Sequence, residues 1–237
     1  MKLYAIGDSF AYPTSIPVNK TWVNLLQLSN YKIFSNVIPG SSVSRFIRLS
    51  RKHFFNERFD AIIINAGFCD YSVKKVSFFE FMSQQSKENI KACRKANLKP
   101  ELNHYLTYRF FNLCFRFYRK FESWKPVSSL SQFSDDFERL LKYAMENTDK
   151  VIIINNPGST AEFNNRKTSE LKLADSFEDF SKNYNLEIVR LAFKHKLHLI
   201  DLTAIDLVNI DYLPDGFHYG VKTHHHIFCE IEKLLQG

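Results

Sequence analysis

Short apolar runs alternate along this chain with longer segments in which apolar residues recur at helical spacing. The runs expected to form buried strands are 3–6, 31–37, 60–65, 151–154 and 197–202. The segments expected to form helices are 21–28, 43–57, 133–146, 170–195 (interrupted near 183–185) and 221–235. Strands that alternate with helices of this length require right-handed crossovers. The pattern therefore predicts an α/β fold, a parallel sheet with helices on both faces.

One long segment breaks the alternation. Residues 71–130 contain no strand-like run, and 104–124 are aromatic, basic and helical in pattern. We interpret 71–130 as a helical insertion after the third strand, within a single domain that spans 1–237. Its aromatic stripe is typical of a core face, and a lid, a homodimer face or a peripheral membrane contact are the alternatives. Because it leaves the third strand, we expect it to overhang the cleft.

Composition narrows the class of protein. No apolar run approaches the ~20 residues of a membrane span, and no leader precedes the first strand, so we expect a cytoplasmic protein. Four scattered cysteines without a C-x-x-C pair predict reduced thiols, with no metal site and no cofactor. The net charge of +7 suits an acidic partner, such as a polyanionic glycan, a lipid- or nucleotide-linked phosphate or an anionic membrane. No nucleic-acid motif is present, so nucleic acid is not expected.

Gly7-Asp8-Ser9 places a hydroxyl directly after the first strand. In open α/β sheets this edge is where reacting groups collect, although such a tripeptide alone is also an ordinary polar turn. Asp215 and His218 lie three residues apart after the last strand, so their side chains can point the same way. An aspartate there can fix the imidazole tautomer, and the imidazole can then take a serine proton. The order Ser, Asp, His is an accepted triad order.

An acyl-transfer site also needs donors for the developing oxyanion. The backbone N–H groups of Ser9 and Gly40 are candidates, because both residues follow predicted strand ends. Glycine at position 40 lets the backbone approach the reacting group closely.

Together these blocks resemble the SGNH (GDSL-type) hydrolase family. The matching features are G-D-S at 7–9, the glycine at 40, G-x-x-D at 67–70 and D-G-x-H at 215–218. The resemblance implies a three-layer, flavodoxin-like αβα sandwich around a five-stranded parallel sheet. It also implies roles for five groups: nucleophile Ser9, base His218, orienting Asp215, and oxyanion donors at Ser9 and Gly40.

The third block departs from the family, whose members usually carry asparagine where this chain has Cys69. A thiol is a weak donor, and losing one oxyanion donor typically costs ~10²–10³ in rate. Asn65 is the substitute donor that we consider first, with Asn155 and Asn156 as others. For any one of them, a turn or capping role is the ordinary reading. Sugar- and polysaccharide-modifying members that lack this asparagine occur, as the resemblance implies.

The sequence therefore predicts a serine-dependent esterase that acts on an O-acylated sugar, polysaccharide or glycolipid. An O-acyltransferase that uses the same triad and a non-catalytic carbohydrate-binding protein are the alternatives. The residues expected to contact substrate are Asp8, Asp70, Asn155, Asn156 and Arg166.

Overall fold

The computed structural model describes residues 1–13, 16–54, 57–71, 127–156, 174–204, 211–213 and 218–237. These residues belong to one compact unit, Met1–Ser72 with Pro126–Gly237. Most of the expected insertion, together with Arg166 and Asp215, lies outside the described residues. The insertion, its placement over the cleft and the single-domain interpretation stay predictions.

The sheet of this unit has five parallel strands in the order β2-β1-β3-β4-β5. The strands are β1 (Lys2–Gly7), β2 (Lys32–Val37), β3 (Ala61–Asn65), β4 (Val151–Ile154) and β5 (His198–Ile200). Each of the five expected strands is present, and β4 has the predicted bounds. The central strands β3 and β4 are buried at every residue, as expected for a parallel sheet covered on both faces.

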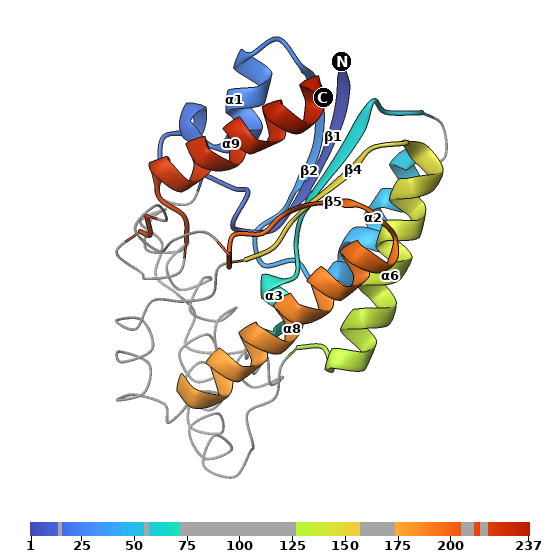
Figure 1. Ribbon diagram of the computed structural model, residues 1–237, viewed down its shortest axis with the longest axis vertical. Coiled ribbons are helices and arrows are strands. Elements are labelled where there is room, and N and C mark those ends of the chain that lie inside the picture. Colours follow the sequence, from blue (N-terminus) through green and yellow to red (C-terminus); the bar gives the residue numbers. More distant parts are fainter. Residues whose placement is uncertain (14–15, 55–56, 72–126, 157–173, 205–210, 214–217) are drawn as a thin grey trace, which may run out of the picture. The chain divides into compact units, whose positions relative to one another are not determined.

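Helices cover both faces of the sheet, so the three-layer fold class is confirmed (Figure 1). On one face lie α1 (Trp22–Leu28) and α9 (Val221–Gln236), and on the other α2 (Val43–Phe54), α6 (Leu130–Asn147) and α8 (Ala174–Lys194). Two short elements are the 3₁₀ helix η1 (Val18–Lys20) and α3 (Phe68–Tyr71). Within the described ranges, no helix has the length and apolar character needed to cross a bilayer.

The expected break in α8 near 183–185 is wrong, because the helix is continuous there. Tyr184 and Asn185 are buried and bonded to other elements. The Tyr184 hydroxyl donates to the carbonyl of Ser128, and Asn185 Oδ1 accepts from the N–H of Asn156 at 3.1 Å. Tertiary contacts therefore outweigh the weak helix propensity of two asparagines.

The strand order creates a switch point between β1 and β3. The chain leaves β1 toward β2 on one side and later returns to β3 on the other. Gly7 and Asn65, the last residues of these strands, are register partners, and the N–H of Ile38 donates to the Gly7 carbonyl at 2.9 Å. The segments after β1, β2 and β3 therefore meet at one edge, where ligands bind in doubly wound sheets.

Candidate active site

The Gly-Asp-Ser segment forms a tight turn that presents Ser9. The Asp8 carbonyl accepts from the N–H of Ala11 at 3.2 Å, and Asp8 Oδ1 accepts from the N–H of Phe10 at 3.0 Å. The turn folds so closely over Gly7 that a Cβ there would lie 2.3 Å from the Ala11 Cβ. Asp8 and Phe10 are buried, whereas Ser9 between them is half-buried. The hydroxyl residue is therefore the accessible member of a rigid turn.

Asp8 also ties this turn to the segment after β3. Its Oδ2 accepts from the N–H of Phe68 at 3.1 Å, and its own N–H donates to the Asn65 carbonyl at 3.2 Å. Complete burial raises the pKa of Asp8 to about 7, against the lowering effect of the Phe10 hydrogen bond and with a further raising contribution from Asp70. Asp8 is thus a buried connector between two loops.

Asp70, after β3, likewise connects its loop to other segments, namely the start of α2 and Ser128. Its Oδ2 accepts from the N–H of Val43, the first residue of α2, at 2.9 Å, and its Oδ1 accepts from Ser128 Oγ at 2.9 Å. A carboxylate is favourable at a helix N-terminus, where backbone N–H groups lack helical partners. Burial raises the pKa of Asp70 to about 6. The carboxylate fixes the start of α2, directly after the Gly40 turn.

Asp8 and Asp70 are buried and bonded to backbone groups of the scaffold, and the expectation that both contact substrate stays a prediction. Each has 0% exposure, and both oxygens of each carboxylate accept from protein donors. Both carboxylates connect the loops of the site through hydrogen bonds to neighbouring segments.

Two glycines take backbone conformations that other residues rarely adopt. Gly40 has φ = 73° and is exposed, and Gly67 has φ = 123°. A Cβ at Gly67 would also lie 3.3 Å from the Phe133 ring. The glycines quoted for the second and third blocks are therefore required by the backbone itself.

His218 lies on one arm of a short antiparallel pairing. Its carbonyl accepts from the N–H of Leu213 at 2.8 Å, and the N–H of Gly220 donates to the Asp211 carbonyl at 2.8 Å. The half-buried His218 imidazole has its centroid 5.5 Å from that of Phe10, the residue after Ser9. The fold therefore brings the segments of the expected nucleophile and base into contact. The role of Asp215 stays a prediction.

Phe10 is a contact point that the sequence analysis missed. Its ring packs at 4.6 Å from both Phe68, after β3, and Tyr219, beside His218. The Tyr219 hydroxyl in turn donates to Asn156 Oδ1 at 2.9 Å. The sequence offered one signal for this contact, because an aromatic residue directly follows both Ser9 and His218. Phe10 and Tyr219 together link the ends of β1, β3 and β4 to the His218 segment.

The three asparagines considered as donors are fully buried and bonded to the scaffold. Asn65 Nδ2 donates to the Ile154 carbonyl at 3.2 Å. Asn155 donates to Asp201 Oδ1 at 2.6 Å and accepts from the N–H of Leu202 at 2.7 Å. The Nδ2 of Asn156 has no hydrogen-bond partner among the described residues. The assignment of these asparagines as oxyanion or substrate contacts stays a prediction.

Cys69 itself lies in the short helix α3 and is 4% exposed. Across the described ranges, no three His, Cys, Asp or Glu side chains converge as metal ligands. In the 224–226 histidine run, His224 is buried and its Nδ1 accepts from the N–H of Trp22 at 3.4 Å, whereas His225 is exposed.

No protein-family model and no curated protein matches this sequence. Solved structures do match over nearly the whole chain. A lipase/acylhydrolase from Enterococcus faecalis has a TM-score of 0.62 at 14% identity, covering 100% of this chain and 95% of its own. The acetyl xylan esterase AlAXEase has a TM-score of 0.61 at 12% identity, covering 99% of both chains.

A third similar structure is Axe2, an acetylxylan esterase from Geobacillus stearothermophilus. Its TM-score is 0.58 at 12% identity, and the match covers 99% of this chain and 93% of Axe2. At such low identities these likenesses show a shared fold. The chain therefore has the fold of these lipases and esterases, as its resemblance to SGNH hydrolases implied.

Proposed function

We propose that this protein is a serine esterase that removes acyl groups from a carbohydrate through an acyl-enzyme formed on Ser9. The observation that carries the proposal is the Ser9 turn itself. It holds an accessible hydroxyl residue between two buried neighbours and packs Phe10 against the His218 ring. The fold shared with esterases supports the reaction class, and the two acetylxylan esterases among the similar structures support a sugar substrate.

The chemistry follows from the groups present. Ser9 Oγ attacks the ester carbonyl while His218 takes the hydroxyl proton. The carbonyl oxygen becomes an oxyanion, which the backbone N–H groups of Ser9 and Gly40 stabilise. His218 then returns the proton to the departing sugar oxygen, leaving an acyl ester on Ser9. A water molecule then gives a proton to His218 and attacks the acyl carbonyl, and His218 passes that proton to Ser9 Oγ as the carboxylic acid leaves. Asp215 is the proposed orienting group for the imidazole.

The proposed site has the thiol of Cys69 where the family pattern has an amide, so it has one strong oxyanion donor fewer. Two backbone donors still face the oxyanion in this scheme, so we expect a slower esterase and not an inactive protein. A rate lower by ~10²–10³ than that of an esterase with all three donors is the expected scale.

The direct test uses peracetylated xylo-oligosaccharides and measures acetate release by the wild type, Ser9→Ala and His218→Gln. We expect release by the wild type and a loss of at least ~10³-fold in each variant, because nucleophile and base act as one unit. Lys196→Gln, an exposed change in the turn between α8 and β5, is the matched control and should keep full activity. Equal acetate release by the wild type and Ser9→Ala would overturn the proposal.

A further inference from the structure

A second concave surface lies beside α9, separate from the groups assigned to catalysis. It is a groove of about 640 Å³, lined on one side by Lys20 of η1 and Leu25 of α1, and on the other by α9. Its α9 lining begins at Val221 and Lys222 and continues to Lys233. The volume is within the range of small-ligand sites. We call it the α9 groove.

The α9 groove is positively charged. Three lysines line it, and the single carboxylate in the lining, Glu230, is paired with Lys233 Nζ at 2.6 Å. Neither Lys20 nor Lys222 forms an ion pair within the part of the chain that the structure describes. Asp211, at the start of α9, already accepts from the backbone N–H groups of Lys222 and Thr223. Two ammonium groups in the groove therefore lack an acidic partner among the described residues.

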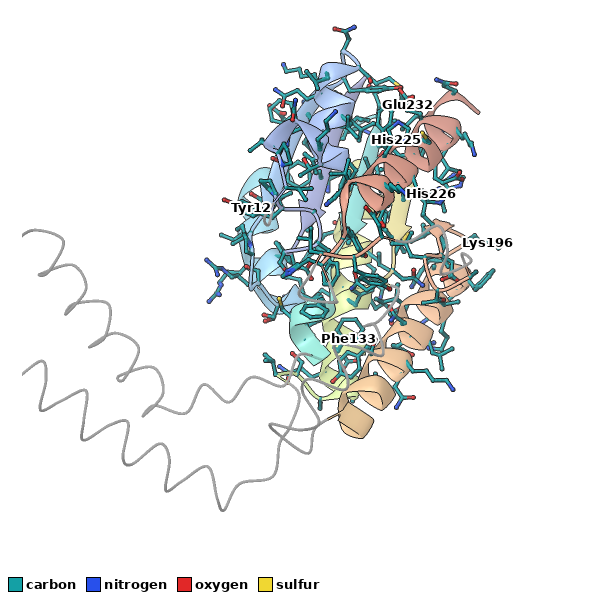
Figure 2. All side chains as sticks on the ribbon, turned by 90° about the vertical axis from the view of Figure 1, so that its left-hand side faces the viewer. Tyr12, Phe133, Lys196, His225, His226 and Glu232 are labelled. Atoms are coloured by element: carbon teal, nitrogen blue, oxygen red, sulfur yellow. The ribbon has the colours of Figure 1, made fainter. Side chains whose placement is uncertain are left out.

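The rest of the lining favours a particular kind of anion. Leu25 and the 39%-exposed Val221 provide apolar contact area. His225 and His226 add imidazoles that can hydrogen-bond hydroxyl groups (Figure 2). Among the described lining residues there is no Phe, Tyr or Trp, the large aromatic side chains on which single-stranded nucleic acid commonly stacks its bases. A carboxylate or phosphate carried on a sugar ring fits this combination of ammonium, imidazole and aliphatic groups.

The groove also adjoins both catalytic segments along the chain. The 3₁₀ helix η1 begins nine residues after Ser9, and α9 begins three residues after His218. We propose that the α9 groove binds an acidic sugar unit of the same glycan whose ester is cleaved at Ser9, so that the substrate is an anionic polysaccharide. The inference rests on the proposed function for its link to catalysis, but the binding itself can be tested without any reaction.

The binding test titrates the full chain with three probes of similar size and measures affinity by calorimetry in the presence of EDTA. The probes are an unesterified oligogalacturonate, a sugar phosphate and a neutral xylo-oligosaccharide. We expect the acidic probes to bind and the neutral one to bind more weakly, and the preferred acidic probe tells carboxylate from phosphate. Lys20→Gln/Lys222→Gln should weaken acidic binding about tenfold, the scale of two partly exposed charges.

A matched double variant removes the same charge elsewhere. Lys182→Gln/Lys196→Gln alters two exposed lysines, one on α8 and one just after it, and neither lines the α9 groove. It should leave the affinity for acidic probes unchanged. An equal loss in both double variants, or tight binding of the neutral probe, would overturn the groove proposal. So would the absence of any acidic binding in a wild type shown by circular dichroism to be folded.

A kinetic test separates this inference from the proposed function. On acetylated oligogalacturonate, Lys20→Gln/Lys222→Gln should raise KM about tenfold with little change in kcat. On p-nitrophenyl acetate, which has no acidic group, it should match the wild type. If no ester is cleaved while acidic sugars still bind at the lysines, the proposed function fails and the groove stands. If esters are cleaved but the lysine changes alter neither KM nor affinity, the groove fails alone.

Discussion

Two fully buried carboxylates hold the loops at one half of the sheet's carboxyl edge. At the other half two buried amides do so, and one of them, Asn155, is bonded to the half-buried carboxylate of Asp201. On the β1–β3 side, Asp8 and Asp70 accept from backbone N–H groups of neighbouring segments. On the β4–β5 side, Asn155 accepts from a backbone N–H, and Asn156 accepts from the Tyr219 hydroxyl. Both halves connect loops, but their carboxylates differ in pKa. Burial raises the pKa of Asp8 and Asp70, whereas for Asp201 the raising effect of burial is outweighed by hydrogen bonds from Thr203 and Asn155, which lower its pKa.

The largest loss of unfolding free energy is expected from removing the side chain of Asp8. Asp8→Ala leaves the buried N–H groups of Phe10 and Phe68 without their acceptor, at about 1–3 kcal/mol each. The free energy of unfolding should fall by about 2–6 kcal/mol. Asn155→Ala, which orphans the N–H of Leu202 alone, should lose about half as much. Urea unfolding measures both, and equal losses would remove the distinction between the two halves.

The second prediction concerns how the free energy of unfolding depends on pH between about 4 and 7, where Asp8 on the β1–β3 side should titrate. Folded Asp8 keeps its proton up to about pH 7, whereas the unfolded chain loses it near 3.8. The folded state thus holds more protons in this window, so the contribution of Asp8 to the unfolding free energy falls as pH rises from about 4 to about 7. A shift of about three pKa units corresponds to about 4 kcal/mol.

The measurement compares unfolding free energies of the wild type, Asp8→Asn and Asn155→Ala from pH 4 to pH 8. Asp8→Asn should be less stable than the wild type by an amount that shrinks toward high pH, because the wild type loses the contribution of its protonated carboxyl. Asn155→Ala should run parallel to the wild type. A constant gap between the wild type and Asp8→Asn would show that Asp8 does not titrate in this window.

A third prediction concerns the donor that the β3 side lacks. Cys69→Asn should raise kcat on p-nitrophenyl acetate, by at most ~10²–10³, if the amide reaches the oxyanion. The 4% exposure of Cys69 limits the space for a larger side chain, so Cys69→Ser serves as a control of similar size that cannot reach as far. A gain in the asparagine variant alone supports the missing-donor account. A rate unchanged by asparagine in a folded variant contradicts it.

The smallest loss of unfolding free energy is expected on the β4–β5 side, from removing the Tyr219 hydroxyl. Tyr219→Phe removes the hydrogen bond to Asn156 Oδ1 but keeps the ring against Phe10. The loss of unfolding free energy should be about 1 kcal/mol, the usual net value of one such bond. The position of His218 should be preserved, so kcat should change less than threefold. A large kcat loss with little loss of stability would show that the hydroxyl, and not the ring, positions the base.

Local signals explain how much of this arrangement could be read from the sequence. The buried strands and most helix bounds follow from apolar runs and periodicity. Thr21 caps α1 as expected, accepting from the N–H of Asn24 at 3.3 Å. The need for glycine at position 40 was predicted from its place after a strand, and its positive φ of 73° agrees with that prediction.

Long-range contacts were out of reach. The carboxylate of Asp70, 27 residues further along the chain, accepts from the first N–H of α2, and no local pattern predicts that contact. The burial of Asn65 and Asn156 likewise depends on β3 and β4 being neighbours, which no local pattern states. The sequence pattern does not distinguish a polar residue at a strand end that contacts substrate from one that bonds to the protein scaffold.

The central claim is that Ser9 is a nucleophile activated by His218. Its most direct test is intact-protein and peptide mass spectrometry after reaction with a fluorophosphonate probe. The account predicts one phosphonyl group, on Ser9, with no labelling of Ser9→Ala and at least ~10²-fold slower labelling of His218→Gln. Phosphonyl groups on a different residue, or none in a wild type that releases acetate, would contradict it.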